Sequence, residues 1–290
     1  MRLAFLGTPE AALPSLRALV GAGHDVAMVI TRPDRRRGRG SELSPSPVKA
    51  EALSLGLKVG HRLADLDAMD IERGIVVAYG AMIPAAVLDR IPMLNVHFSL
   101  LPRWRGAAPV ERAILAGDEE TGVGIMSLEE TLDTGPLHAE RRTRVDLKTA
   151  TQLTEELARL GAEALVEVLA SRELLEHPTP QVGEATYAEK LTKETFHLDP
   201  RMPAVLLERT VRLGRAFTFI NGRRLKVLEG RLNPTRADPG TLTEVEGEIA
   251  LAANDGALVL EAVQPEGSRP MPAKAWWDGA RLDLAQGGWA

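Results

Sequence analysis

Short runs of aliphatic and β-branched residues alternate, over the first 130 residues, with segments whose apolar positions recur every three or four residues. The short runs predict strands over Arg2–Leu6, Asp25–Thr31, Ile75–Tyr79, Leu94–His97 and Gly122–Leu128. The segments between them predict helices over Ala11–Val20, Val48–Leu55, Ala85–Arg90 and Ala107–Leu115. Strands that alternate with helices are typical of a doubly wound, Rossmann-like α/β sheet, which binds ligands at the carboxyl ends of its strands.

The most regular helical pattern covers Ala150–Ala170. Its apolar positions are Leu153, Leu157, Leu160, Ala164, Leu165 and Val168. Residues with this spacing lie on one face of a helix. We therefore expect this helix to pack on the sheet.

After this helix the periodic pattern stops, and four prolines interrupt residues 177–203, which predicts a linker. Val205–Gly214 again has helical spacing. Short strand-like runs separated by turn residues follow, at Ala216–Ile220, Arg224–Leu228, Gly247–Leu251 and Leu258–Val263. The pattern predicts a first domain over 1–176, a linker over 177–203 and a small antiparallel β-barrel over 204–290.

The composition is that of a globular protein with two domains. A chain of 290 residues is long for one compact core. Apolar residues make up 44% and charged residues 26%, and no apolar run approaches the roughly 20 residues that cross a bilayer. With no cysteine, the chain has neither a disulfide framework nor a thiolate metal site. We expect a cytoplasmic protein without a membrane segment.

The net charge of −5 argues against a general affinity for nucleic acid, but basic residues gather in two segments. Arg32–Arg39 contains five arginines and one aspartate, and Glu208–Arg236 contains eight basic and two acidic residues. Both segments suit a localised polyanion site. Both also suit a solvated surface, and the charge pattern alone leaves the two interpretations open.

Candidate chemistry lies at the end of the fourth predicted strand. Asn95 and His97 are two residues apart, so their side chains point to the same side of a strand. Asp133 follows in a separate segment. A histidine that exchanges a proton, an asparagine that donates to a developing oxyanion and an aspartate that orients the histidine suit acyl-type transfer. A lone Asn-x-His is more often a polar strand end, so the pair needs further support.

Gly7–Glu10 follows the first predicted strand and opens a helix, where dinucleotide enzymes bind the pyrophosphate. The Gly-x-Gly-x-x-Gly fingerprint is absent, which disfavours a nicotinamide-dependent oxidoreductase. A tight turn with a proline near the helix start explains these residues equally well.

A longer string surrounds the polar pair. Asn95–Pro102 reads NVHFSLLP, Arg103–Pro109 reads RWRGAAP and Leu132–Gly135 reads LDTG. Together these segments resemble the signature of the folate-dependent formyltransferase family. Pro45–Lys49 and Thr186–Glu194 extend the resemblance along nearly the whole chain, and they favour the members of this family that act on methionyl-tRNA.

The resemblance implies a reaction and a site. The formyl donor would be 10-formyltetrahydrofolate, and the acceptor would be the α-amino group of methionine on initiator methionyl-tRNA. Catalysis would rest on Asn95, His97 and Asp133. Folate would be bound by Tyr79, Gly80, Ala81, Met82, Ile83, Ser99, Leu100, Leu101, Pro102, Leu132, Thr134 and Gly135. No metal is expected, because the six histidines have no paired-ligand spacing.

The same resemblance gives the basic segments a role in tRNA binding. The family carries a basic loop after the second strand, so the acceptor arm would be contacted by Arg35, Arg36, Arg37 and Arg39. The C-terminal domain would be an OB-like tRNA-binding domain that uses Arg212, Arg215, Arg223, Arg224 and Lys226. Arginine suits both phosphate contact and stacking on an unpaired base. We expect the enzyme to be a monomer.

Two other functions stay open. A formyltransferase acting on a glycinamide nucleotide or an amino sugar would share Asn95, His97 and Asp133, although it would not need the arginine loop. A catalytically inactive RNA-binding relative would have no chemical need of all three residues. Phe98 and Thr131 depart from the residues usual in the family, and these departures concern the shape of the pocket rather than its chemistry.

Overall fold

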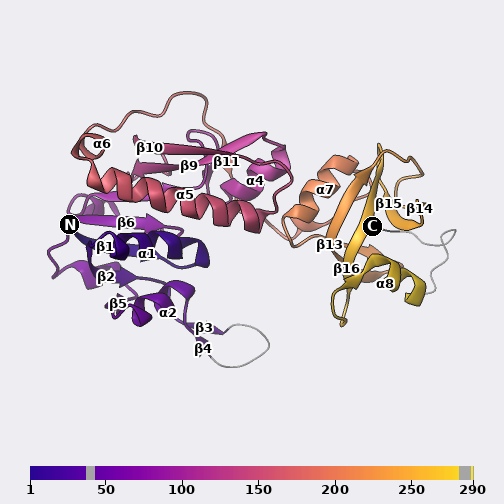
Figure 1. The fold of residues 1–290 in the computed structure, drawn as a ribbon, viewed down its shortest axis with the longest axis horizontal. Helices are drawn as coiled ribbons and strands as arrows, with labels where there is room; N and C mark the ends of the chain where they lie inside the picture. The colour runs from indigo at the N-terminus through magenta and orange to yellow at the C-terminus, as the bar shows by residue number, and fades with distance from the viewer. Residues whose placement is uncertain (37–42, 281–288, 290) are drawn as a thin grey trace. The chain divides into compact units, whose positions relative to one another are not determined.

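The structure, a computed structural model, describes residues 1–36, 43–280 and 289 (Figure 1). Contacts within the chain divide it into two compact units. The first comprises Met1–Val110, Glu120–Arg144 and Leu153–Glu189, and the second Glu111–Glu119, Val145–Gln152 and Lys190–Ala290. The residues predicted as a linker, 177–203, divide between the two units, and the predicted domain boundaries stay predictions.

A seven-stranded sheet in the order β10-β9-β7-β6-β1-β2-β5 forms the core of the first unit. Its strands are β1 (Arg2–Gly7), β2 (Asp25–Ile30), β5 (Val59–Gly60), β6 (Arg73–Val77), β7 (Met93–His97), β9 (Glu120–Ser127) and β10 (Leu137–Arg144). Five strands are parallel, whereas β9 runs antiparallel to β7 and β10 antiparallel to β9. All five predicted strands of this sheet are present, and the doubly wound α/β class is confirmed.

The sequence does not predict β10. Its sequence, LHAERRTR, buries only His138, because β10 is an edge strand with a single neighbour in the sheet. Exposed charges are common on edge strands, where they discourage pairing with another chain. The alternation that identifies a half-buried strand is therefore missing here.

The helices between these strands lie close to their predicted positions. They are α1 (Leu13–Gly21), α2 (Pro47–Ser54), α3 (Ala85–Leu88), α4 (Pro109–Ala116) and α5 (Ala150–Ala170). Proline stands in the first turn of α1 and of α2, where its missing N–H costs nothing. Ser46 precedes α2, and its hydroxyl accepts a hydrogen bond from the backbone N–H of Lys49 at 3.0 Å, which satisfies one of the free donors at the start of the helix.

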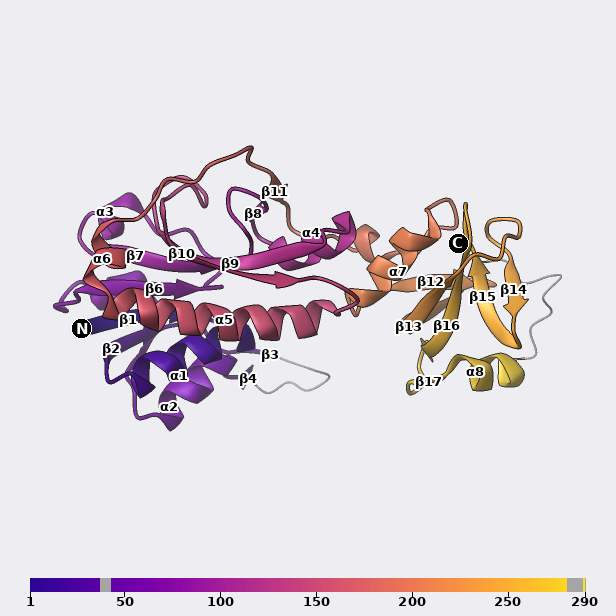
Figure 2. The ribbon, with the colours of Figure 1, turned by 45° about the horizontal axis from the view of Figure 1, so that its top comes forward.

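The helix α5 packs closely on one face of the sheet, as its apolar stripe predicts (Figure 2). At Gly161 an added Cβ would lie 2.7 Å from Val96 Cγ1 and 3.0 Å from Val123 Cγ2, so β7 and β9 approach the helix backbone there. Because side chains alternate along a strand, Asn95 and His97 point away from Val96 and from the helix. The covered face of β7 thus fixes which side its polar residues occupy.

Part of the predicted linker is docked on the first unit. Thr179 exchanges two backbone hydrogen bonds of 2.8 Å with Leu137 at the start of β10. Further along, β11 (Tyr187–Ala188) pairs in parallel with β8 (Arg105–Gly106). We call residues 179–188 the docked segment.

The second unit is built on an antiparallel sheet in the order β12-β13-β16-β15-β14, with β17 paired to β16. Its elements are α7 (Ala204–Arg212), β12 (Phe217–Ile220), β13 (Arg223–Asn233), β14 (Leu242–Val245), β15 (Glu248–Ala252), β16 (Ala257–Pro265), β17 (Met271–Pro272) and α8 (Ala273–Ala280). The order has two ends, so the sheet is an open half-barrel version of the predicted barrel. The sequence predicts neither β14 nor α8.

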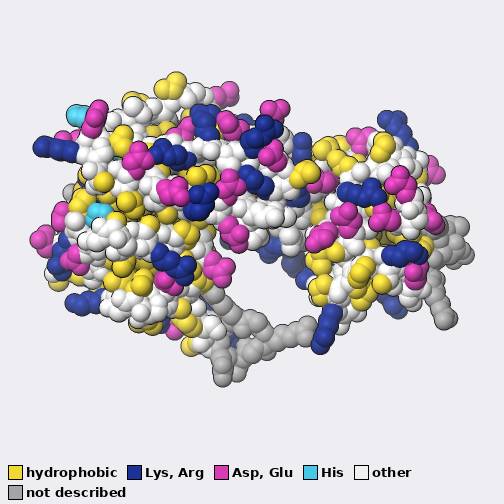
Figure 3. All heavy atoms as spheres, viewed as in Figure 1, with side chains coloured by type: hydrophobic (Ala, Val, Ile, Leu, Met, Phe, Trp, Pro, Cys, Tyr) yellow, Lys and Arg dark blue, Asp and Glu magenta, His cyan; other side chains and the backbone are white. Residues whose placement is uncertain are grey.

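Charged side chains of both signs are interspersed on the face drawn in Figure 3, as expected for a net charge of −5. Within the described part of the chain, no helix has the length and apolarity needed to cross a bilayer.

Candidate active site

The ends of β6 and β7 open onto a cavity of about 540 Å³. It brings together residues that are far apart in the sequence: the segment after β6, the end of β7, and the loop between β9 and β10. Of the predicted site residues, its lining includes Tyr79, Gly80, Ala81, Met82, Ile83, Asn95, His97, Leu132 and Asp133. The predicted catalytic trio and the main folate segment therefore border one cavity.

The imidazole of His97 is held in a defined tautomer. His97 is only 6% exposed, and its Nε2 lies 2.9 Å from the backbone carbonyl oxygen of Trp104. A carbonyl oxygen can only accept, so Nε2 is the nitrogen that carries a proton. Nδ1 faces Asp133 Oδ2 at 3.7 Å, which is an ion-pair distance but too long for a good hydrogen bond. Nδ1 is therefore the nitrogen available to exchange a proton beside a carboxylate.

The carboxylate of Asp133 is fixed by the backbone N–H of Gly106 and by the backbone conformation of Asp133 itself. Its Oδ2 accepts a hydrogen bond of 2.8 Å from the N–H of Gly106. Asp133 itself has a φ of 52°, a left-handed conformation that non-glycine residues seldom adopt. Such a conformation persists where the surrounding contacts enforce it, and it is common at functional sites.

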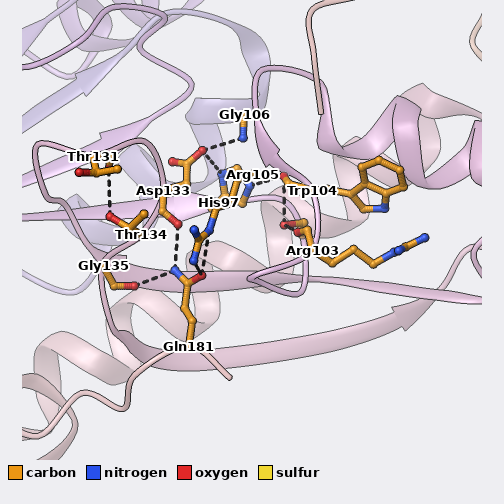
Figure 4. A network of polar contacts seen from close by, with 11 residues as sticks. His97, Arg103, Trp104, Arg105, Gly106, Thr131, Asp133, Thr134, Gly135 and Gln181 are labelled. Atoms are coloured by element: carbon orange, nitrogen blue, oxygen red, sulfur yellow. Dashed lines mark hydrogen bonds and ion pairs between the residues drawn. The ribbon is translucent and has the colours of Figure 1, made fainter. Parts of the chain in front are cut away.

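The loop between β9 and β10, which carries Asp133, is held by two residues that the sequence does not single out, Gln181 and Arg105 (Figure 4). The Nε2 of Gln181 donates to the carbonyl oxygens of Asp133 at 2.9 Å and Gly135 at 2.8 Å. Its Oε1 accepts from the Arg105 guanidinium, at 2.6 Å from Nη2. No sequence signal marks Gln181, because it follows Pro178 and Pro180 in a segment without periodicity. Arg105 could be noted only as part of the longer signature string.

Asn95 is half-buried at the cavity wall. Among the described residues, none forms a hydrogen bond with its side-chain amide. An amide without a protein partner at a cavity wall can donate to a bound molecule.

The segment after β6 is shaped by its backbone. Ala78 has a φ of 46° and Gly80 a φ of 75°, so the chain turns sharply where it leaves the sheet. The Arg32 guanidinium donates to the Gly80 carbonyl oxygen, and the Thr8 hydroxyl donates to the Tyr79 carbonyl oxygen at 3.4 Å. Burial raises the pKa of the Tyr79 hydroxyl above its usual value, so this group is a neutral donor. Met82, by contrast, is 66% exposed at the cavity wall.

Six residues predicted to bind folate lie outside the cavity lining: Ser99, Leu100, Leu101, Pro102, Thr134 and Gly135. The Ser99 hydroxyl is fully buried and donates to the Arg103 carbonyl oxygen at 2.6 Å. Thr134 donates to Glu129 at 3.1 Å, and a Cβ at Gly135 would lie 1.9 Å from the Ser127 carbonyl oxygen. These residues shape the loops around the cavity, and direct contact with folate stays a prediction for them.

The cavity lining also contains residues that the sequence does not single out as ligands: Val76, Ala78, Val96, Phe98, Gly106, Ala107, Pro109, Met126, Leu128, Glu129 and Thr131. Phe98 and Thr131, which both depart from the family pattern, are among them. They therefore border the space that a substrate would occupy, where a change of side chain would alter the shape of the pocket.

The predicted tRNA residues fall into two groups. Arg35 and Arg36 form the exposed strand β3 (Arg35–Arg36), which pairs with β4 (Leu43–Ser44), while Arg37 and Arg39 lie outside the described residues. In the second unit, Arg215, Arg223 and Lys226 are exposed, and Arg224 lies over the Phe217 ring at 4.2 Å.

Arg212 differs from its neighbours. It is 11% exposed, lies 2.9 Å from Glu208 and donates to the Asp146 carbonyl oxygen at 2.8 Å. Burial raises the pKa of the Glu208 carboxyl, although Arg212 opposes that shift. Arg212 is therefore bonded within its own unit, and a role for it in tRNA binding stays a prediction.

No group of three or more potential metal ligands gathers within the described residues. The groups that surround His97 are backbone carbonyl, carboxylate and amide, in an arrangement suited to proton exchange and hydrogen bonding.

Comparison with known proteins identifies the family. A profile described as "Formyl transferase" matches residues 1–169, and one described as "Formyl transferase, C-terminal domain" matches residues 190–281. Among solved structures, WlaRD, a sugar 3N-formyl transferase crystallised in the presence of dTDP and 5-N-formyl-THF, is similar with a TM-score of 0.70. It is 16% identical, and the alignment covers 93% of this chain and 99% of that one, so it supports the fold.

Curated relatives are much more similar in sequence. The methionyl-tRNA formyltransferase of Heliobacterium modesticaldum is 42% identical, over 97% of this chain and 98% of its own length. That of Novosphingobium aromaticivorans is 45% identical, over 93% of this chain and 94% of its own length. Identity at this level along nearly the full length of both chains shows common descent as whole proteins. The chain belongs to the methionyl-tRNA formyltransferase family.

Proposed function

We propose that this enzyme transfers the formyl group of 10-formyltetrahydrofolate to the α-amino group of methionine carried by initiator tRNA. The observation that carries the proposal is the convergence of Asn95, His97 and Asp133 on one cavity, in a chain 42–45% identical to curated methionyl-tRNA formyltransferases. Because initiator tRNA is used where translation begins, we place the reaction in the cytoplasm.

The reaction begins when the neutral amine attacks the formyl carbon, which gives a tetrahedral intermediate with a new oxyanion. The Asn95 amide has no partner among the described residues, so it can donate to this oxygen. A second donor is His97 Nδ1–H once the imidazole is protonated, since Nε2 already serves the Trp104 carbonyl oxygen. Removing one such donor typically costs roughly 2.7–4 kcal/mol of barrier. The bond to the Trp104 carbonyl oxygen holds the His97 ring in place before the charge develops.

Asp133 supports the charged form of His97. Its Oδ2 lies 3.7 Å from Nδ1, within ion-pair distance of a charged imidazole. The same carboxylate can accept the proton that the amine loses, directly or through a water. When the intermediate collapses, the C–N bond to tetrahydrofolate breaks and the folate nitrogen takes up a proton. The charges within this site supply the polarisation that the reaction needs, so the proposal includes no metal.

The folate would lie along the segment after β6. Tyr79–Ile83 offers backbone groups for the polar edge of the pterin, and the apolar side chains of Ile83, Val76 and Leu128 can cover its face. A cavity of about 540 Å³ is within the range of pockets that hold molecules of this size.

For tRNA, we propose two contact regions. The arginine segment that begins at Arg35 would contact the acceptor arm. In the second unit, the hairpin surface would contact the body of the tRNA; it comprises the face of β12 and β13 with Phe217, Phe219, Arg224 and Lys226, together with Arg215 before β12 and Arg223 beside the turn. In the described part of the chain, none of the four cations on this surface forms an ion pair with a carboxylate, so their charges are available to phosphates.

A formylation assay tests the proposal. The purified enzyme with 10-formyltetrahydrofolate should formylate charged initiator tRNA, and it should be at least about 10²-fold less efficient with free methionine or an amino sugar nucleotide, because remote binding energy of the tRNA raises the rate. Efficient use of a small amine would support the alternative formyltransferase. Absence of any transfer would support an inactive RNA-binding relative. Light scattering of the purified enzyme checks the expectation of a monomer.

A further inference from the structure

The groups that hold His97 and Asp133 are themselves held by the docked segment, residues 179–188. The Trp104 carbonyl oxygen accepts from His97, and the Trp104 N–H donates to the Thr186 hydroxyl at 2.9 Å. The Arg105 N–H donates to the Thr186 carbonyl oxygen at 2.9 Å. The loop of residues 103–107 is thus bonded to the catalytic pair on one side and to the docked segment on the other.

The loop that carries Asp133 is bonded to the same segment by a side chain. Gln181 donates two hydrogen bonds, to the carbonyl oxygens of Asp133 and Gly135, and its Oε1 accepts two from the Arg105 guanidinium. Its amide therefore ties together the two loops that meet at the catalytic carboxylate (Figure 4). Because Asp133 has a φ of 52°, its backbone needs an external constraint, and the bond from Gln181 to its carbonyl oxygen provides one.

We propose that Gln181 is a positioning residue, which acts on the reaction only through the placement of the Asp133 carboxylate. Gln181 is absent from the cavity lining, so it has no contact with a molecule bound there. The inference rests on the proposed formyl transfer, in which Asp133 supports the charge on His97.

The chemistry of the amide makes the role specific. Glutamate has nearly the same shape and would keep the contact with Arg105. Its second oxygen would face the carbonyl oxygens of Asp133 and Gly135, and two acceptors without a proton between them repel. Both Gln181→Ala and Gln181→Glu should therefore release the Asp133 loop, although only the second retains the size of the side chain.

Turnover and binding should respond differently. We expect kcat to fall by roughly 10- to 100-fold in both variants, because a shift of about 1 Å in a catalytic group can cost that much. Folate binding should change by less than about twofold, since the residues of the cavity wall are intact. Gln152→Glu is a matched control: the Gln152 side-chain oxygen accepts from Thr149, and glutamate retains that oxygen, so kcat should stay at the wild-type value.

A double-mutant cycle separates a positioning role from a merely structural one. Asp133→Asn removes the carboxylate charge and leaves the backbone carbonyl that Gln181 binds. If Gln181 acts through the carboxylate, adding Gln181→Ala to Asp133→Asn should cause no further loss of kcat. A further loss of tenfold or more in the double mutant overturns the proposal, because it shows that Gln181 supports something other than Asp133.

A crystal structure of Gln181→Ala gives a readout that does not depend on activity. The Gly106 N to Asp133 Oδ2 distance should lengthen from 2.8 Å beyond hydrogen-bond range. An unchanged distance overturns the proposal. Failure of the proposed formyl transfer would instead appear in the wild-type enzyme, as absence of transfer to every amine tested.

Discussion

The active-site loops and the hairpin surface place their charges by opposite means. Asp133 is nearly buried and receives a hydrogen bond from the Gly106 backbone, while its own carbonyl oxygen is bound by Gln181. The cations of the hairpin surface are mostly exposed, and within the described residues they have no carboxylate partners. Arg224 lies on the ring of Phe217 and Arg215 on that of Phe196, at 4.2 and 4.5 Å.

The difference fits the roles proposed for the two regions. A group that stabilises a developing charge must be in place before the charge appears, because reorganisation during the reaction costs rate. A group that binds phosphates gains from a charge that nothing in the protein neutralises, and its exact position matters less. Substitutions in the first region should therefore lower turnover, and those in the second should weaken binding.

The largest effect is expected at the proposed catalytic pair, His97 and Asp133. His97→Ala and Asp133→Asn should each lower kcat by at least about 10²-fold, since each removes charge stabilisation that operates mainly in the transition state. Folate affinity, measured by calorimetry with a non-reactive folate, should change by less than about twofold. Turnover close to the wild-type value in either variant would contradict the assigned mechanism.

A smaller effect on kcat/KM is expected from the hairpin surface. Changing Arg215, Arg223 and Lys226 together to Gln should lower kcat/KM for charged tRNA by about tenfold at moderate salt. The slope of log K for tRNA binding against log salt concentration should decrease in magnitude by about 2–3, because fewer counterions are released. Arg231→Gln is the control: Arg231 lies on the same strand but already pairs with Glu248, so both quantities should stay unchanged.

A substitution in α5 can change the packing behind the site and leave every polar side chain of the site in place. Gly161→Ala places a methyl group 2.7 Å from Val96 Cγ1, between the helix and the strand that carries Asn95 and His97. Overpacking of this kind typically costs about 1–3 kcal/mol of the free energy of unfolding, which urea denaturation would measure. At Gly21 in α1 an added Cβ has no neighbour within 4 Å, so Gly21→Ala should be neutral or slightly stabilising. Equal effects at the two glycines would contradict the tight contact.

The smallest effect concerns pH and lies away from the site. His138 is buried, its Nδ1 donates to the Leu174 carbonyl oxygen at 2.8 Å, and its Nε2 accepts from the Ser127 hydroxyl at 2.8 Å. Burial lowers the pKa of His138 below its usual 6.5. The unfolded chain thus binds more protons than the folded one, so the contribution of this residue is complete above pH 6.5 and is lost as pH falls below it.

His138→Gln should therefore make the unfolding midpoint less sensitive to pH between 7 and 5. Thermal unfolding at several pH values would measure this. The effect of His138→Gln on kcat at neutral pH should be negligible, because His138 lies outside the cavity lining. A variant that loses stability on acidification as steeply as the wild type would show that other groups dominate.

The sequence predicts the parts of the molecule that repeat a physical pattern. The five predicted strands of the first sheet and the helix α5 follow from strand patterning and helical spacing. The polar pair at Asn95 and His97 follows from its spacing on a strand, and the signature string links it to Asp133.

The remainder depends on contacts between segments that no local pattern encodes. Gln181 becomes significant only because its segment docks beside residues 103–107, which lie more than 70 positions earlier in the chain. Ser99 illustrates the converse, since a polar residue in the signature proves to be fully buried and bonded to the Arg103 carbonyl oxygen. The pairing of Arg212 with Glu208 likewise separates one arginine from the others in a basic segment.

The docked segment has a consequence for enzymes assembled from parts of relatives. The match to the N-terminal family profile ends at residue 169, yet Gln181, Thr186 and Ala188 all bond to the loops around His97 and Asp133. A chimaera joined at residue 169 would bring in a foreign docked segment and retain activity only if that segment reproduced these bonds. A chimaera joined after Glu189 would keep the whole arrangement, so the point of exchange, rather than the identity of the C-terminal partner, would decide whether the hybrid turns over.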